Sequence, residues 1–228
     1  MIFSSFRRSE QDQIWVGMAK ETAHQLGTPL SSLMAWTGLL EAIDDVPRDY
    51  LVEMNRDIER LNVVVDRFSK IGSKPELKPH VVADIIESTV TYMRPRISSK
   101  IELTFDVEDS ARGLQARLSP SLFSWVLENL IRNAVDAMDG SGSISLLLQL
   151  NAGGGVSLLV RDTGKGIPKA RWKEVFAPGY TTKSRGWGLG LSLVKRIIEE
   201  YHEGKIFIKD SKLGEGTTFV IQLDPPTN

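Results

Sequence analysis

Two short segments in the second half of the sequence combine glycines and polar side chains in a way that suits a phosphorylated ligand. Asp162 to Pro168 follows directly on a predicted strand, and its two glycines let the backbone turn sharply and approach a ligand. The carboxylate of Asp162 can accept a hydrogen bond from an exocyclic amine. Gly186 to Leu191 opens a predicted helix, where free backbone amides and the helix dipole favour phosphate. Each pattern alone is also typical of an ordinary turn.

A third group is a pair of asparagines on one face of a predicted helix. Asn129 and Asn133 are four residues apart, so their side chains lie one above the other. Their amide oxygens are suitable ligands for Mg²⁺, which usually keeps several water and phosphate oxygens as well. Two helical asparagines on their own are more often solvent-facing residues, so the prediction depends on the three groups occurring together.

Together these groups resemble the ATP-binding domain of the GHKL type, and the resemblance covers residues 76–228. It rests on segments in the family's order and spacing: Asn129 to Met138, Asp162 to Pro168, Phe176, Gly186 to Leu191 and Gly214 to Thr217. The resemblance implies that Asp162 meets the adenine amine, that Asn133 reaches Mg²⁺ and that Thr217 helps to form the adenine pocket. The segment between Pro168 and Gly186 would be the mobile lid.

The resemblance thus implies ATP and Mg²⁺ as cofactors. Lys183 in the lid joins Mg²⁺ as a candidate for neutralising phosphate charge. The residues expected to bind the nucleotide are Asn129, Arg132, Asn133, Asp136, Asp162, Gly164, Gly166, Ile167, Thr181, Thr182, Lys183, Gly186, Gly188, Leu189, Gly190, Leu191 and Thr217.

Near the amino terminus, the segment Glu21 to Leu30 resembles the phosphoacceptor box of histidine kinases. On an ideal helix His24 lies opposite the apolar stripe, so its ring is expected to face solvent. Thr28 lies one turn further along the same face and Glu21 nearly one turn before it, which groups three polar side chains. A lone exposed histidine is usually a solvated surface residue without a specific role. The box and the ATP-binding domain downstream nevertheless identify His24 as the predicted phosphoacceptor.

The residue after this histidine departs from the family's pattern. Many members have an acidic residue there that resembles a general base, whereas this chain has Gln25. An amide can orient a ring N–H but cannot take up a proton at neutral pH, so we expect Glu21 or solvent to assist. By resemblance, Gln25 and Thr28 also orient a hydrolytic water for a phosphatase reaction. Pro29 removes one helical hydrogen bond and predicts a local bend.

Hydrophobic periodicity predicts an α+β chain of two domains, residues 1–75 and residues 76–228. Apolar residues at helical spacing predict one helix from Ile14 to Ile43 and a second from about Pro47 to Gly72, with Asp45 as its N-cap. One apolar stripe per helix is poorly buried by a hairpin alone, so we expect a homodimer that closes a four-helix bundle. The alternative is that the hairpin packs on the downstream domain.

The downstream domain is predicted to be an α/β sandwich of the GHKL type, because its periodicity changes repeatedly between that of helices and that of strands. The sequence predicts helices at residues 83–93, 119–138 and 189–201, and strands at residues 101–107, 114–118, 143–150, 156–161, 205–209 and 217–223.

Composition excludes several classes of protein and site. With 28 basic and 29 acidic residues the net charge is -1, which offers no broad attraction to nucleic acid or to an anionic membrane. The absence of cysteine excludes disulfides and thiolate metal sites and fits a reducing cytoplasm. Apolar runs are far too short to cross a bilayer. We therefore expect a cytoplasmic protein, or the cytoplasmic part of a membrane-bound sensor.

The combined resemblance is to sensor histidine kinases of two-component systems. It implies ATP-dependent autophosphorylation of His24 and phosphotransfer to an aspartate of a response-regulator receiver domain, with phosphatase activity as a further expectation. One alternative is a hydrolytic GHKL ATPase, which places a glutamate where this chain has Asn129; Glu128 is adjacent but turned about 100° away. Others are a dimeric nucleotide-binding scaffold without turnover, and a serine kinase of the same fold, which would lack the hairpin.

Overall fold

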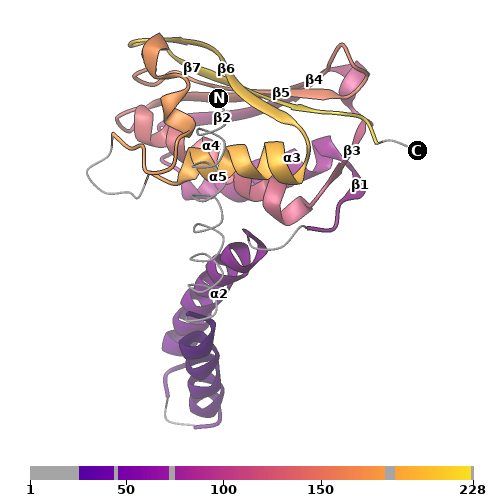
Figure 1. The fold of residues 1–228 in the computed structure, drawn as a ribbon. Coiled ribbons are helices and arrows are strands. Elements are labelled where there is room, and N and C mark those ends of the chain that lie inside the picture. The colour runs from indigo at the N-terminus through magenta and orange to yellow at the C-terminus, as the bar shows by residue number, and fades with distance from the viewer. Residues whose placement is uncertain (1–25, 44–45, 72–74, 183–187, 227–228) are drawn as a thin grey trace, which may run out of the picture. The chain divides into compact units, whose positions relative to one another are not determined.

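The computed structural model describes residues 26–43, 46–71, 75–182 and 188–226. The chain divides into two compact units, residues 1–75 and residues 76–228 (Figure 1). Within the described ranges, no helix is long and apolar enough to cross a membrane.

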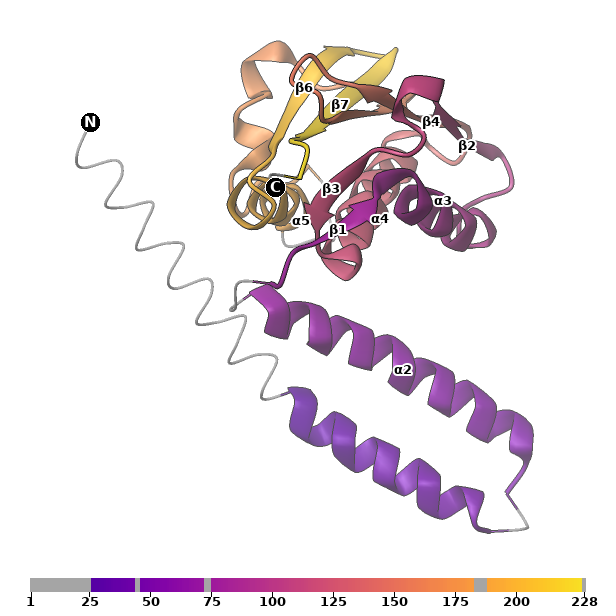
Figure 2. The same cartoon turned by 90° about the vertical axis from the view of Figure 1, so that its right-hand side faces the viewer.

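The described part of the first unit is a pair of antiparallel helices, which agrees with the two predicted helices where they are described. The predicted start of the first helix, residues 14–25, lies outside the described residues. Residues 26–41 form the first helix and α2 (Arg48–Ile71) the second, and they lie side by side (Figure 2). Asn55 of α2 donates a hydrogen bond from Nδ2 to Glu41 Oε1 over 2.7 Å. The predicted N-cap Asp45 lies outside the described residues. The carbonyl of Pro47 accepts the first bond of α2, from the Tyr50 amide at 3.1 Å.

The hairpin buries only part of its apolar surface. Leu30, Leu51 and Ile58 are between 4% and 7% exposed and are the apolar side chains that the described part of the hairpin buries. Leu26, Leu33 and Ile43, which the periodicity places on the same apolar stripe as Leu30, are 44%, 43% and 51% exposed. Among the side chains that the structure describes, the other large apolar ones left exposed on the two helices are Met34, Trp36, Leu39, Tyr50, Val52, Met54 and Leu61. Within its described residues the hairpin therefore leaves much apolar surface exposed.

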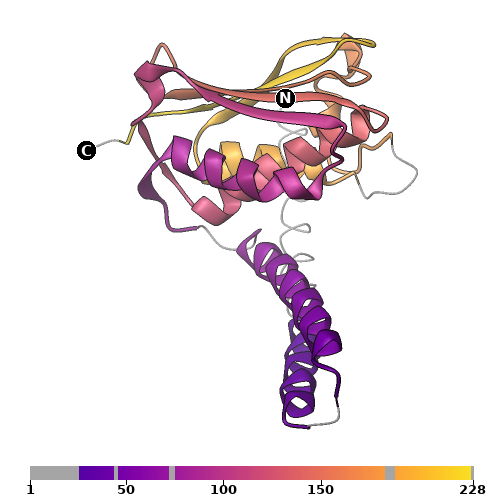
Figure 3. The same ribbon diagram turned by 180° about the vertical axis from the view of Figure 1, so that it is seen from behind.

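The second unit is a sandwich of one sheet layer and one helix layer. Its five-stranded sheet has the order β2-β4-β5-β7-β6, in which β2 and β4 are parallel and the other pairs antiparallel. The helices cover one face of this sheet (Figure 3). The strands are β2 (Ile101–Val107), β4 (Gly142–Leu150), β5 (Val156–Asp162), β6 (Lys205–Lys212) and β7 (Gly216–Leu223), and β1 (Lys78–Val81) pairs separately with β3 (Gln115–Leu118).

The helices of the sandwich are α3 (Val82–Met93), α4 (Pro120–Ala137) and α5 (Gly190–Arg196). A π-helical turn, Ile197–Tyr201, continues α5 and ends the helix predicted over 189–201. Short 3₁₀ turns lie at Arg94–Arg96, Asp109–Ala111, Lys169–Arg171 and Glu174–Phe176. The predicted strands and helices of this unit are confirmed to within a few residues, and β1 was not predicted.

Periodicity explains the core of the sandwich. Phe123, Leu127 and Ile131 recur every four residues on α4 and are fully buried. On β4, Ile144 and Leu146 alternate with more exposed residues and are also fully buried. The apolar stripe of α4 therefore packs against the buried face of the sheet, and this packing fixes the position of α4 relative to the strand ends.

A buried histidine joins two ends of the helix layer. The side chain of His202 is 6% exposed, and its Nε2 accepts a hydrogen bond from the Ser119 amide at 3.0 Å. Its Nδ1 lies 2.7 Å from the Ile197 carbonyl oxygen, so Nδ1 carries the proton. Burial lowers the pKa of His202, and the two backbone hydrogen bonds oppose this shift.

We expect His202 to make the free energy of unfolding depend on pH. Its pKa is lower in the folded chain than the usual 6.5, so the unfolded chain binds more protons below that value. The contribution of His202 to the free energy of unfolding therefore has its full value above about pH 6.5. As the pH drops below that value, the free energy of unfolding falls by at most about 1.4 kcal/mol per pH unit. Urea unfolding at several pH values measures the slope. The variant His202→Gln should reduce this slope, and the control His80→Gln should leave it unchanged. An unchanged slope in His202→Gln would contradict the role of His202 in the pH dependence.

Candidate functional site

One face of α4 carries four of the predicted nucleotide-binding residues. Asn129, Arg132, Asn133 and Asp136 follow at helical spacing, with the two asparagines half-buried and the two charged residues exposed. Asn129 donates from Nδ2 to the Trp125 carbonyl at 2.9 Å, which fixes the orientation of its amide.

The start of α5 comes close to this face. A Cβ atom on Gly190 would lie 3.3 Å from Asn129 Oδ1 and 3.8 Å from Asn133 Nδ2. The backbone of the second glycine segment and the asparagine pair are therefore neighbours, although some 60 residues separate them in the chain. Gly188, Leu189 and Leu191 flank Gly190 and are half-buried like it.

Asp162 ends β5 and lies directly across from Thr217, the second residue of β7. The two side chains are 5% and 4% exposed. The Gly164 amide donates to Asp162 Oδ1 at 2.8 Å. Burial raises the pKa of Asp162, while hydrogen bonds from the backbone of Gly164 and Thr217 oppose the rise. The carboxylate is thus held in place by the turn that follows β5 and by β7, in an environment that disfavours its charge.

The turn after Asp162 is held by hydrogen bonds of its backbone on three sides. The Lys165 amide donates to the Ala137 carbonyl at the end of α4 over 2.9 Å, and the Lys165 carbonyl accepts from the Gly214 amide at 2.9 Å. The Ile167 amide donates to Ser211 Oγ at 2.7 Å. These contacts bring the end of α4, the 162–168 turn and the segment between β6 and β7 together.

Glycine is required within this turn. Gly164 has no space for a side chain, because a Cβ would lie 2.7 Å from the Ala137 carbonyl oxygen. Gly166 has φ +73°, and a Cβ there would lie 2.1 Å from the Lys212 carbonyl oxygen.

We expect Gly166→Ala to lower the free energy of unfolding by about 3 kcal/mol or more, since it adds a backbone clash to an unfavourable φ. Gly154→Ala is the matched control: Gly154 has φ +82° but nothing within 4 Å of its Cβ position. That control should cost only about 1 kcal/mol. Urea unfolding of both variants isolates the steric contribution, and equal losses would show that Gly166 is needed for its dihedral angle alone.

The segment predicted as a lid is anchored at both described ends. Phe176 packs edge-on against Phe219 of β7, with ring centroids 6.1 Å apart, and Lys195 of α5 lies 5.8 Å from the Phe176 ring centre. The Gly179 amide donates to the Gly188 carbonyl at 3.1 Å. Of the predicted phosphate ligands here, Thr181 and Thr182 are exposed, and Lys165 Nζ donates to Thr182 Oγ1 at 3.5 Å. Lys183 and Gly186 lie outside the described residues.

The predicted phosphoacceptor region is described only in part. Glu21, His24 and Gln25 lie outside the described residues. Thr28 and Pro29 are exposed on the helix of residues 26–41, which continues through the proline. Ser31 donates from Oγ to the Gly27 carbonyl at 2.9 Å, one turn back.

Sequence reasoning missed two residues that hold the site together. Ser211 was not singled out, because a serine between two charged residues on a strand carries no motif. Trp172 donates from Nε1 to the Ile167 carbonyl at 3.0 Å and so anchors the end of the turn. A tryptophan four residues after Pro168 was the available signal for this contact.

Comparisons with known proteins agree with this geometry. Residues 120–227 match the family described as histidine kinase-, DNA gyrase B-, and HSP90-like ATPase. The chain is 30% identical over 231 residues to the sensor histidine kinase ZraS of Salmonella typhimurium, covering 97% of this chain and 48% of that protein. It is 28% identical to sporulation kinase E of Bacillus subtilis, covering 95% of this chain and 29% of the other. The chain therefore spans half the length, or less, of these two relatives.

Solved structures show the same fold. The catalytic domain of histidine kinase ThkA has a TM-score of 0.59 and 26% identity, covering 66% of this chain and 97% of that domain. ThkA in complex with the response regulator TrrA has a TM-score of 0.61 over 100% of this chain and 67% of that one. At 18% identity the second likeness concerns the fold alone.

Proposed function

We propose that this chain transfers the γ-phosphoryl group of ATP to its own His24. Residues 120–227 match the histidine kinase-, DNA gyrase B-, and HSP90-like ATPase family, and the relatives of the chain include sensor histidine kinases. The observation that carries the proposal is that three predicted parts of the site converge on α4. The turn that follows buried Asp162 bonds to the end of α4 at Ala137, and the start of α5 approaches the asparagine face of the same helix. The same chain carries the histidine box from Glu21 to Leu30.

In the proposed complex, Asp162 accepts a hydrogen bond from the adenine amine, as its burial and fixed orientation favour. The triphosphate then extends towards the start of α5, where backbone amides are available, and towards Arg132 and Asn133. Asn133 would hold a Mg²⁺ ion through its amide oxygen, and that ion would neutralise phosphate charge. Within the described ranges no group of three or more histidine, aspartate or glutamate side chains forms a metal site, so phosphate and water would supply most of its other ligands.

Transfer requires a neutral imidazole with one unprotonated nitrogen in line with the γ-phosphorus. That nitrogen forms the new P–N bond while the bond to the bridging oxygen breaks, and ADP leaves with the electron pair. The proton on the other ring nitrogen passes to Glu21 or to water, which restores a neutral ring in phosphohistidine. Catalysis of this kind depends mainly on positioning and charge neutralisation.

Residues 1–75 would supply the dimeric stalk that presents His24. The apolar residues that the hairpin leaves exposed, among them Leu33, Trp36 and Leu39, support a second copy as their partner. Dimerisation would place four helices around these side chains. A response-regulator receiver domain is the proposed acceptor of the phosphoryl group, supported by the complex in which ThkA is bound to TrrA. Phosphatase activity through Gln25 and Thr28 belongs to the same proposal.

A hydrolytic ATPase is less consistent with the geometry. Such an enzyme needs a carboxylate that activates water beside the γ-phosphate. Glu128 is 5% exposed, on the part of α4 that faces the core, whereas Asn129 faces the start of α5. The carboxylate nearest in sequence therefore does not point where hydrolysis requires it.

Incubation with γ-³²P-ATP and Mg²⁺ tests the proposed function. The expected product is labelled protein whose label is lost in acid and kept in base, as phosphohistidine requires. Acid-stable label would indicate a serine kinase. Release of inorganic phosphate without labelled protein would indicate a hydrolytic ATPase, and ATP binding with neither product would indicate a scaffold.

A further inference from the structure

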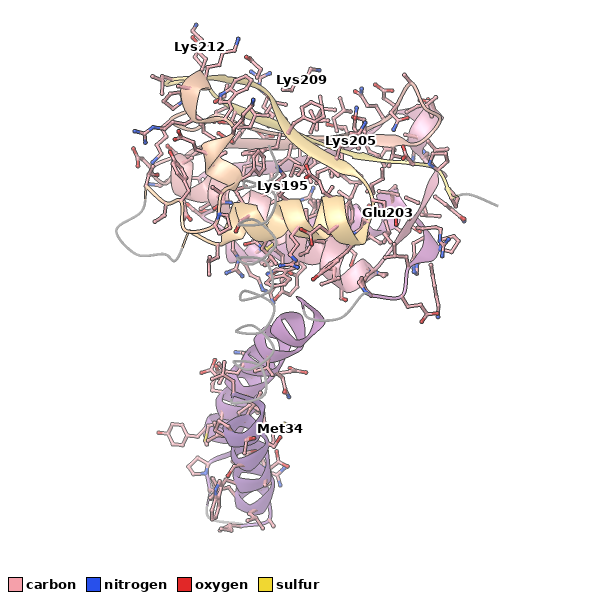
Figure 4. The ribbon with its side chains drawn as sticks, viewed as in Figure 1. Met34, Lys195, Glu203, Lys205, Lys209 and Lys212 are labelled. Atoms are coloured by element: carbon pink, nitrogen blue, oxygen red, sulfur yellow. The ribbon has the colours of Figure 1, made fainter. Side chains whose placement is uncertain are left out.

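A serine outside every motif lies beside the proposed adenine pocket. Ser211 is on β6, where the pairing with β7 shifts register between Ile208 and Asp210. The shift gives β6 one extra residue and pairs Ser211 with Thr217. Lys209, the extra residue, lies on the side of the sheet away from the helices (Figure 4). Ser211 is thereby turned to the same side as Thr217 and Asp162, in one row across three strands.

The hydroxyl of Ser211 has three partners. It lies 2.7 Å from the Ile167 amide nitrogen, 3.1 Å from the Gly216 carbonyl oxygen and 2.9 Å from Thr217 Oγ1. The amide can only donate and the carbonyl can only accept. Since a serine has a single hydroxyl proton, satisfying the carbonyl uses it. All three contacts are satisfied together only when Thr217 donates its own proton to Ser211.

The orientation of the Thr217 hydroxyl determines what it offers a ligand. With its proton directed to Ser211, Thr217 Oγ1 has only lone pairs left for other partners. Asp162, across from Thr217, is a carboxylate and also accepts hydrogen bonds. The polar side chains on this row therefore present acceptors and no donor. An exocyclic amine at purine C6 suits such a site, and a carbonyl oxygen at the same position does not.

We propose that Ser211 is a positioning residue that determines base specificity: it takes the Thr217 proton and so makes the pocket select a 6-amino purine over a 6-oxo purine. The inference rests on the proposed nucleotide site. Ser211 acts through Thr217 and the 162–168 turn, and it does not itself contact the base.

Competition binding with ATP and inosine triphosphate tests this inference on the whole chain with Mg²⁺ present. The two bases differ at C6, an amine against a carbonyl oxygen, and also at N1, which bears a proton only in hypoxanthine. The parent is expected to prefer ATP. In Ser211→Ala the Thr217 hydroxyl is free to rotate and donate. The ratio of the two dissociation constants, inosine triphosphate over ATP, should therefore fall about tenfold, which corresponds to one hydrogen bond. Ser211→Thr keeps the hydroxyl and should keep the preference. Thr218→Ala, one residue along β7 and on the opposite face, is the matched control and should leave it unchanged.

A double-variant cycle separates specificity from simple support of the fold. If Ser211 acts through Thr217, adding Ser211→Ala to Thr217→Val should not change the preference further. An equal loss of affinity for both nucleotides in Ser211→Ala, or an unchanged ratio, overturns the inference while leaving nucleotide binding in place. If Ser211→Ala does not fold, Ser211→Cys makes the same test, because a thiol is a weak donor and acceptor. A parent chain that binds neither nucleotide overturns the proposed function itself.

Discussion

The His24→Ala variant is expected to lose the acid-labile label, with incorporation from γ-³²P-ATP falling by about two orders of magnitude or more, to background. Alanine removes the only nitrogen nucleophile of the predicted box and leaves the rest of the hairpin composition unchanged. The next residue, Gln25, does not replace it, because its amide is not nucleophilic. Filter binding of labelled protein, after separation under alkaline conditions, measures the effect.

The same variant should bind ATP as tightly as the parent, because Asp162 and the asparagine face belong to the other compact unit. Asn133→Ala is the complementary variant, which keeps His24 and removes the proposed Mg²⁺ ligand. Each variant alone should be unlabelled, and label recovered on mixing them would show transfer between the two copies of a dimer. Label in His24→Ala equal to that of the parent would disprove the proposed phosphoacceptor.

The fold of the second unit was largely predictable because its elements are long and regularly patterned. Ile144, Leu146 and Leu148 alternate on β4, and that period of two allows only a strand with one buried face. The missed strand β1 has four residues, one of them Pro79, so it carries no such pattern. The π-helical turn from Ile197 was not predicted, because one turn of π-helix shifts the apolar period too little to read from sequence.

The site was predictable where function depends on unusual residue types. Glycines at positions 164 and 166 signal a turn with no room for side chains, and their contacts with Ala137 and Lys212 show why. Ser211 was not predictable, because it lies beyond the strand predicted over 205–209. Simple alternation continued along β6 would also place it on the outer face of the sheet. The extra residue in β6 reverses that alternation, and nothing in the local sequence marks it. The residue types of the candidate site were thus visible in sequence, whereas the contacts that orient them were not.

Asp162→Asn is the second variant with a large expected effect, and it should lower ATP affinity about ten- to a hundredfold. The substitution replaces a charged acceptor with an amide whose Nδ2 can only donate, and hydrogen bonds to charged groups contribute about 1.5–3 kcal/mol. The asparagine Oδ1 can still accept from Gly164, so the turn keeps its support. Inosine triphosphate should lose less affinity than ATP, because its C6 oxygen can accept from the new amide.

Asp162→Asn should not lower the free energy of unfolding, although it should weaken ATP binding. Burial raises the pKa of Asp162 in the folded chain, so the folded state holds this proton more tightly than the unfolded state. At low pH the bound proton contributes to the stability of the folded chain, and this contribution is lost as the pH rises through the raised pKa. At neutral pH the carboxylate is therefore a buried charge that lowers the free energy of unfolding. A neutral asparagine removes this cost, so the unfolding free energy at neutral pH should be equal to that of the parent or higher.

The pH dependence of binding provides the last check on Asp162. ATP affinity of the parent should weaken as the pH falls through the raised pKa of Asp162, because the protonated carboxyl loses its charge and gains a donor. Asp162→Asn should show no such dependence. A variant that instead unfolds more easily and keeps its ATP affinity would mean that Asp162 serves the sheet and not the nucleotide. Weaker binding together with unchanged or greater stability is expected only of a buried charge retained for its ligand.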